Sequence, residues 1–458
     1  MDHYHIENET IIFHKSFHSP LTPNILEKLK EIKSIHFNGS HFNDSIDNLP
    51  NNIQFIDFNS IFDQNIDNLP ESLTKLKMGF YFDKGVDFLP SSLKELELGS
   101  SFNQPIENLP HSIETLIIGD CFNQPINNLP NSLKTLNLGI SFNQSIVNLP
   151  KSIENLEVIG NFNQQICNKI GEPYLLPPNL KYLRLGKEFV QKICCDLPGH
   201  DQGCQCPSLL PNTLQTLDFG RNFNHPINNL PTSLIKLKLG GHFDQPTNNL
   251  PKSLEHLEFG HNYDQPLVNL PENLKTLILG EQFNQRIVYE IPEIGKIAKR
   301  LPDSINCVKF GNNFTQMIGN YFPGLDGGCS CQSFLPKSLK YLEFGDKFNQ
   351  NIWCEKRKKV IEPCCPSFLP HGIIRLKFGE NFNRNIDQLP DSIEQLILGY
   401  SNSQCLVLFD RMVFNQKIGK LPANLKELII HPDYRYLDEI KSRYPSLMII
   451  SEKKLRLK

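Results

Sequence analysis

The hydrophobic pattern of the chain repeats every 20 residues through its first third. In the segment Leu89 to Ile106, LPSSLKELELGSSFNQPI, a Leu-Pro pair is followed by L-x-x-L-x-L-G and then by Phe-Asn-Gln. Leu96 and Leu98 stand two residues apart, so they face one side of a strand and the residues between them face the other. The pattern therefore predicts one short strand per repeat, with an apolar face and a polar face.

The repeat continues along the chain, but its spacing changes after the first third. Leu-Pro pairs stand at 49, 69, 89, 109, 129 and 149, and later pairs stand at 176, 210, 230, 250, 270, 301, 335, 369, 389 and 421. The strand pattern survives these changes in seventeen segments between Ile32 and Ile430. The fold class that follows is a β-rich solenoid, a leucine-rich-repeat-like right-handed coil with a parallel strand per repeat and a short irregular back.

The other repeated residues have predicted structural roles. Phe102 supplies a large apolar plug that stacks from coil to coil, and Asn103 bonds backbone groups that the turn leaves unpaired. Gly99 lets the chain turn sharply after the strand, and the proline of each Leu-Pro pair holds an extended return path.

Both ends of the chain depart from the repeat, so the sequence predicts three regions: residues 1–31, 32–430 and 431–458. The first is an amino-terminal segment and cap with a helix over 23–32, and the last is a cap with a helix from Tyr434 and a strand from Ser446. Within the central solenoid, insertions are expected near 167–175, 194–209, 288–300, 319–334, 353–368 and 400–413. The first region also contains four histidines, for which we favour a polar cap over a metal site: His3, His5, His14 and His18.

Composition and charge limit the possible cellular locations of the protein and the classes of partner that it could bind. The net charge of −3 gives no electrostatic attraction to nucleic acid or to a membrane, and no basic, aromatic-rich region favours nucleic-acid binding. The amino terminus lacks a secretory signal pattern, and no apolar run approaches the roughly 20 residues that span a bilayer. We therefore expect a soluble intracellular, cytoplasmic protein whose 13 cysteines are free thiols or metal ligands.

The polar faces of the predicted strands contain many charged and aromatic side chains. If strands stack in parallel at about 4.8 Å, the Lys75 and Lys77 pair lies beside Glu95 and Glu97, where opposite charges stabilise modestly. This face is either a partner-binding surface or a solvated surface that compensates its own charges. The candidate partner-binding residues are Lys75, Lys77, Glu95, Glu97, Tyr182, Arg184, Lys236, Lys238, His256, Glu258, Tyr341, Arg375 and Lys377.

Three insertions have the same length and end in cysteines: Ile193 to Leu210, Ile318 to Leu335 and Ile352 to Leu369. Clustered thiolates are the ligands of tetrahedral zinc sites, so the insertions contain candidate zinc ligands. The alternative, which we favour, is free or buried thiols in duplicated loops and no cofactor. The candidate ligands are Cys194, Cys195, Cys204 and Cys206 within one insertion, and Cys329, Cys331, Cys364 and Cys365 between two consecutive coils.

The repeated pattern resembles the FNIP repeat, a leucine-rich-repeat-like unit of amoebae and giant viruses, over about residues 32–430. Phe-Asn-Gln stands complete at 102, 122, 142, 162, 283, 348 and 414, and the family's proline is kept at 105, 125, 226, 246 and 266. The resemblance implies a host-cytoplasmic location if the protein is viral. Some relatives have an amino-terminal F-box-like segment that recruits a ubiquitin ligase, but about 30 residues before the first strand are too few for one.

No catalytic motif of the common hydrolase, nucleotide-binding or metalloprotease types occurs in the chain. Carboxylates recur at repeat positions rather than at one singular place, so we expect no enzymatic activity. The sequence predicts a protein–protein interaction scaffold. The alternatives are a substrate receptor that works with ubiquitin-ligase subunits and a structural or self-assembling component.

Overall fold

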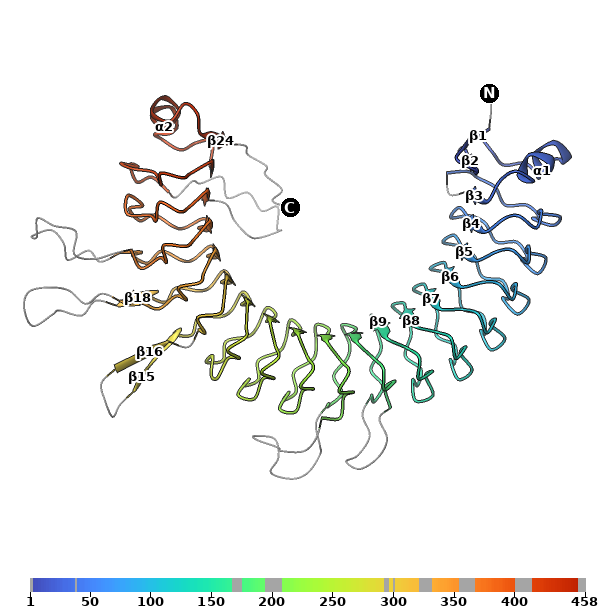
Figure 1. The fold of residues 1–458 in the computed structure, drawn as a ribbon, viewed down its shortest axis with the longest axis horizontal. Helices are drawn as coiled ribbons and strands as arrows, with labels where there is room; N and C mark the ends of the chain where they lie inside the picture. Colours follow the sequence, from blue (N-terminus) through green and yellow to red (C-terminus); the bar gives the residue numbers. More distant parts are fainter. Residues whose placement is uncertain are drawn as a thin grey trace, which may run out of the picture. The chain divides into compact units, whose positions relative to one another are not determined.

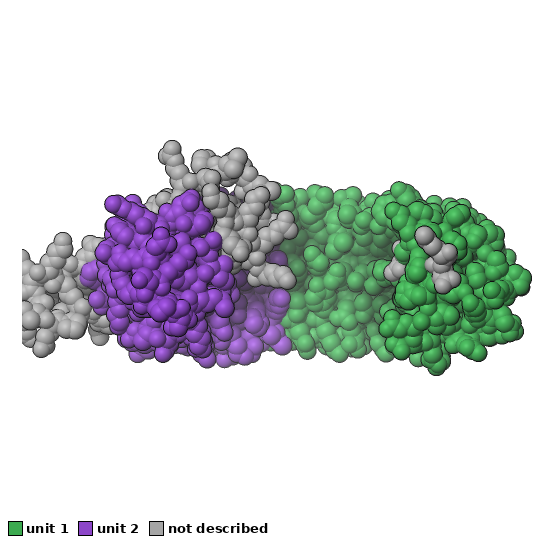
Figure 2. Space-filling model, turned by 90° about the horizontal axis from the view of Figure 1, so that it is seen from above, with its two compact units in different colours: residues 1–234 green, residues 235–458 purple. Residues whose placement is uncertain are grey.

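The computed structural model of the chain describes residues 3–37, 39–166, 175–193, 208–291, 296–299, 301–320, 332–353, 367–399 and 414–451. The chain divides into two compact units, residues 1–234 and residues 235–458 (Figure 2). Each unit is a coil of repeats that contributes one short strand per turn (Figure 1).

The first unit begins with a hairpin and a short helix, which precede nine repeat strands that pair in parallel in chain order. Strands β1 (Tyr4–Glu7) and β2 (Thr10–Phe13) are antiparallel, and β2 pairs in parallel with β3, which follows helix α1 (Pro23–Leu29). The repeat strands are β3 (Ser34–His36), β4 (Phe55–Asp57), β5 (Lys75–Lys77), β6 (Glu95–Leu98), β7 (Thr115–Ile118), β8 (Thr135–Leu138), β9 (Asn155–Val158), β10 (Tyr182–Leu185) and β11 (Thr216–Asp218).

The second unit contains eight repeat strands, followed by helix α2 (Leu437–Arg443) and a final parallel strand β24 (Met448–Ile450). Two antiparallel pairs lie in its insertions: β15 (Val288–Ile291) with β16 (Lys296–Lys299), and β18 (Gly319–Asn320) with β19 (Gln332–Ser333). The repeat strands are β12 (Lys236–Lys238), β13 (His256–Glu258), β14 (Thr276–Ile278), β17 (Cys307–Lys309), β20 (Tyr341–Glu343), β21 (Arg375–Lys377), β22 (Gln395–Leu398) and β23 (Glu427–Ile430).

The described residues thus contain the seventeen repeat strands that the pattern predicts, and the predicted helices and final strand are present as α1, α2 and β24. Helix α1 begins at Pro23, where a missing N–H costs little, and the hydroxyl of Thr22 accepts a hydrogen bond from the backbone N–H of Ile25. The sequence analysis missed the β1–β2 hairpin. Asn8 and Glu9 form the turn of this hairpin, and their φ values of 49° and 58° suit a type I′ turn between two strands. The polar Asn8-Glu9 pair between two strand-like segments was the available signal in the sequence.

The core of each unit is a ladder of stacked aromatic rings, as the repeated phenylalanine predicts. Phe102 is fully buried, and its ring centroid lies 6.1 Å from that of Phe82 and 6.1 Å from that of Phe122. Nearer the strands, the rings of Phe37 and Phe58 are 5.5 Å apart, and parallel strands are spaced by only about 4.8 Å. Because spacing increases from strand to plug, the coils fan out and each unit has its strands on the inner side of the bend (Figure 1).

Hydrogen bonds from coil to coil hold the remaining polar residues of the repeat. The side-chain oxygen of Asn103 accepts from the backbone N–H of Asn123 at 2.9 Å, which confirms the role predicted for this asparagine. The serine of L-P-x-S-L was not assigned a role from sequence. The hydroxyl of Ser112 donates to the carbonyl of Leu93 in the preceding coil at 2.6 Å, and other coils repeat this contact.

Among the described glycines after strands, Gly160 and Gly399 have positive φ values of 84° and 76°, whereas Gly99 is required for a different reason from the one we expected. Gly99 does not have a positive φ; a Cβ at this position would lie 1.7 Å from the carbonyl oxygen of Gly79 in the preceding coil. Atoms of a rigid backbone cannot move away cheaply from such a clash. The glycine therefore permits close approach between coils rather than a left-handed turn.

Candidate functional site

The candidate site in each unit is the strand face, defined as the outward-pointing side chains of the repeat strands. The alternate side chains of these strands enter the core, so those of the strand face are free to vary without loss of packing. In the first unit, Lys75 pairs in register with Glu95, and Lys77 with Glu97. Their ion-pair distances are 2.8 and 2.9 Å, as the expected parallel stacking requires. The hydrogen bond to Glu97 raises the pKa of Lys77 above its ordinary value.

The same compensation of charge continues along the first unit. Arg184 lies between two carboxylates of adjacent strands, 3.7 Å from Glu157 and 3.6 Å from Asp218. Its neighbour Tyr182 is half-buried, and burial together with the charge of Glu157 raises the pKa of its phenol to about 12. This tyrosine is therefore neutral at physiological pH and acts as an aromatic surface with a hydroxyl.

In the second unit, the strand face begins with residues that the sequence analysis also proposed. Lys236 and His256 are in register, as are Lys238 and Glu258, and the last two form an ion pair of 3.0 Å. Lys236 is exposed. These residues form a charged part of the strand face over β12 and β13.

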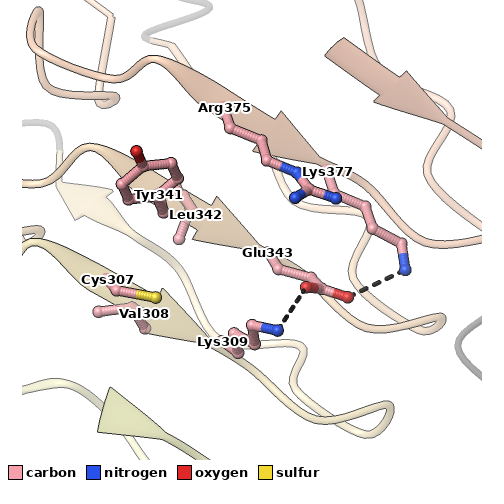
Figure 3. Close-up of a pocket in the computed structure, with 8 residues that line it drawn as sticks. All are labelled: Cys307, Val308, Lys309, Tyr341, Leu342, Glu343, Arg375 and Lys377. Atoms are coloured by element: carbon pink, nitrogen blue, oxygen red, sulfur yellow. Dashed lines mark hydrogen bonds and ion pairs between the residues drawn. The ribbon is translucent and has the colours of Figure 1, made fainter. Parts of the chain in front are cut away.

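Further along the second unit, the strand face contains a small hollow of about 110 Å³ over β17, β20 and β21 (Figure 3). The hollow brings together the predicted residues Tyr341, Arg375 and Lys377, which come from consecutive strands in register. Sequence reasoning did not select its other lining residues, although each occupies a strand position: Cys307, Val308, Lys309, Leu342 and Glu343.

Glu343 is the electrostatic centre of the hollow. Its carboxylate lies 2.9 Å from the ammonium of Lys377 and 3.6 Å from that of Lys309 (Figure 3). Burial raises the pKa of this carboxyl, but Lys377, Lys309 and Arg375 outweigh the burial and leave the pKa below its ordinary value. Glu343 is therefore ionised at neutral pH and holds two cations in place.

Cys307 is the half-buried thiol at the edge of this hollow, and burial raises its pKa. A raised pKa lowers the thiolate fraction at neutral pH, and the thiolate is the reactive form of cysteine. The arrangement therefore does not activate Cys307 as a nucleophile.

All eight candidate zinc ligands lie outside the described residues. In the part of the chain that the structure describes, no three His, Cys, Asp or Glu side chains are grouped as metal ligands. His5 on β1 and His14, which directly follows β2, do approach each other, with ring nitrogens 2.8 Å apart.

The three insertions of equal length end in the same way. In each, a serine hydroxyl accepts a hydrogen bond from the backbone N–H of the leucine two residues later, at 3.0 to 3.2 Å. This shared geometry agrees with the equal lengths read from the sequence. The pairs are Ser208 and Leu210, Ser333 and Leu335, and Ser367 and Leu369.

Among the described residues, neither helix has the length and apolar character needed to cross a membrane. Both α1 and α2 are only seven residues long.

Comparison with known proteins identifies the repeat. A family model described as the FNIP repeat matches a little over half of the chain. The matched residues are 42–81, 62–101, 84–121, 122–160, 207–242, 226–262, 243–282 and 363–401. No curated protein sequence gives a significant match.

Among solved structures, the chain is similar to CroV588, a giant-virus protein described as a novel circular LRR protein. The two are 31% identical, with a TM-score of 0.57, over 94% of this chain and 74% of that one. YopM from Yersinia enterocolitica WA-314 is 18% identical, with a TM-score of 0.46, over 87% of this chain and 75% of its own. YopM from Yersinia pestis, described as a leucine-rich effector protein, is 19% identical, with a TM-score of 0.40 and 84% coverage of both chains. The family match and the similarity to CroV588 agree with the observed coil, and the chain belongs to the FNIP repeat family.

Proposed function

We propose that this protein is a non-enzymatic scaffold that binds another protein through its strand faces. The observation that carries the proposal is the separation of roles within each strand. Leu96 and Leu98 are buried in the core, whereas Glu95 and Glu97 point outward and differ from the residues at the same positions in other coils. A surface whose side chains vary from coil to coil, over a core that stays the same, is suited to binding a specific partner protein.

The chemistry of the strand face also favours binding over catalysis. The hollow of the second unit has about 110 Å³, whereas pockets for small-molecule ligands usually have about 300–1,000 Å³. Its carboxylate, Glu343, is paired with two lysines, and burial suppresses the thiolate form of its cysteine, Cys307. None of these groups is poised for acid–base or nucleophilic chemistry.

Affinity purification with charge-swap variants tests this function. In the first unit, Lys75→Glu, Lys77→Glu, Glu95→Lys and Glu97→Lys are combined, so that both ion pairs survive in reversed polarity. In the second unit, Lys238→Glu and Glu258→Lys do the same. Each swap is designed to keep its ion pairs while changing the pattern of charge that a partner meets, and circular dichroism checks that each variant is folded.

Glu107→Lys is the matched control, because Glu107 is exposed on the return segment of a coil rather than on a strand. We expect at least one swap to release a bound protein that the control retains. If both swaps retain every bound protein, the proposal is wrong.

The identity of the released protein decides between the finer functions. Ubiquitin-ligase subunits among the released proteins indicate a substrate receptor, and release of further copies of this chain alone indicates a self-assembling component. Any other defined partner indicates a scaffold, for which we place the site of action in the cytoplasm.

A further inference from the structure

We propose that the hollow over β17, β20 and β21 is an anchor site for one carboxylate side chain in an acidic segment of a partner protein. The inference rests on the proposed function of the strand faces and gives the chemistry of the partner at one place. It follows from the size of the hollow, the balance of its charges and the unused hydrogen-bond donors of Arg375.

The size of the hollow limits what can enter it. Val308 and Leu342 line it from the middle of β17 and β20, and their side chains are buried in the core, at 0% and 2% exposed. Its volume of about 110 Å³ is a fraction of an ordinary ligand pocket, but it accommodates the head group of a single side chain. An extended partner segment can therefore lie along the strand face and insert one residue.

The charges of the hollow select an anion. Three cations line it, Lys309, Arg375 and Lys377, against the single carboxylate of Glu343. The two lysines share that carboxylate at 3.6 and 2.9 Å, so the hollow retains an excess of positive charge.

Arg375 is the residue that can receive the incoming group. Its guanidinium points into the hollow (Figure 3) and makes no hydrogen bond or ion pair with any other residue in the described ranges. Arginine presents its N–H donors as a fork that matches the two oxygens of a carboxylate. A carboxylate in the hollow satisfies these donors without displacing Glu343 from its lysines.

Tyr341 supplies the apolar side of the same site. It lies in register with Arg375 on the adjacent strand, and 46% of its surface is exposed. The methylene groups of a glutamate side chain can pack on its ring while the carboxylate reaches the arginine. Tyrosine and arginine are also the residue types that are enriched at the energetic centres of protein interfaces.

Selection of peptides on the intact protein tests the proposal without a known partner. A random peptide library displayed on phage is selected against the full chain and, in parallel, against Arg375→Gln. The matched control is Lys252→Gln, which removes an exposed cation next to a Leu-Pro pair of the same unit, away from the strand face. Circular dichroism verifies that the variants are folded.

The selected consensus is then synthesised as a fluorescein-labelled peptide, with glutamate or glutamine at the enriched acidic position. We expect the glutamate peptide to bind about tenfold or more tightly than the glutamine peptide, and Arg375→Gln to abolish that difference. Lys252→Gln should leave the difference unchanged, and Arg375→Lys should retain part of it, since the charge is kept and the fork is lost.

Enrichment without an acidic position, no enrichment at all, or equal preference for glutamate in Arg375→Gln overturns the anchor site. These results leave the proposed function intact as long as strand-face swaps still release a natural partner. The opposite result, partners that no swap releases, contradicts the proposed function itself.

Discussion

Replacing Phe142 by alanine removes one ring from the stacked ladder of the first unit. Phe142 is fully buried, and its ring centroid lies 6.1 Å from that of Phe122 and 6.2 Å from that of Phe162. The substitution removes the buried ring and its contacts with two neighbouring rings. It also leaves a cavity that the rigid coils cannot close. Buried Phe→Ala substitutions typically cost about 3–5 kcal/mol, and we expect a loss of free energy of unfolding in this range.

Native-state hydrogen exchange read by mass spectrometry suits this prediction, because a repeat protein opens locally and need not unfold in one step. Protection of the amides of β7, β8 and β9 should fall most, since these strands belong to the coils around the missing ring. The matched control is Asn137→Ala, which alters the strand face of the same coil and should change the free energy by no more than about 0.5 kcal/mol. A loss below about 1 kcal/mol in Phe142→Ala, or an equal loss in the control, refutes the stacked ladder as the source of stability.

Three further predictions concern the ladder bonds, the hollow and the insertions. Asn143→Ala should lower the free energy of unfolding by about 1–2 kcal/mol in urea titration, because the backbone N–H of Asn163 loses its acceptor at 2.9 Å, whereas Asn143→Asp should retain most of the stability. The pKa of Glu343 is lower in the folded protein than its ordinary value of 4.5, so its stabilisation is complete above that pH and is lost as the pH falls below it. Thermal unfolding from pH 7 to pH 3 should show a smaller decline in Glu343→Gln than in the unaltered chain, and an equal decline in both contradicts the assignment. If the cysteine-rich insertions bind zinc, gently purified protein should contain stoichiometric metal by elemental analysis. Protein purified in this way without metal would contradict the zinc hypothesis.

The repeating part of the structure could be predicted from the sequence because each coil contains the same pattern of apolar and polar residues. Alternation at Leu96 and Leu98 indicates a strand, and a phenylalanine at a constant distance from it indicates a stacked plug. The register that places Lys75 beside Glu95 then follows from parallel stacking alone. Such features depend on spacing within a coil and on its nearest neighbours, both of which the sequence contains.

Features that depend on how the coils pack against one another could not be predicted from the sequence in the same way. Close approach of Gly99 to the preceding coil is a property of backbone packing, and the bend of each unit depends on the difference between ring and strand spacing. The hollow required Cys307, Tyr341 and Arg375 to be aligned across long insertions, so its members are not neighbours in any sequence window. A comparison of outward residues coil by coil would have found Lys309 and Glu343.

Lysine footprinting of a purified complex tests the central claim most directly, because lysines lie both on the strand faces and on the return segments of the coils. The strand faces contain Lys75 and Lys236, while Lys151 and Lys252 are exposed next to the Leu-Pro pairs. Acetylation rates measured by mass spectrometry with and without the partner should fall for lysines of at least one strand face and remain unchanged at Lys151 and Lys252. Protection at Lys151 and Lys252 with unchanged rates along both strand faces would contradict the proposal that this protein binds through its strands.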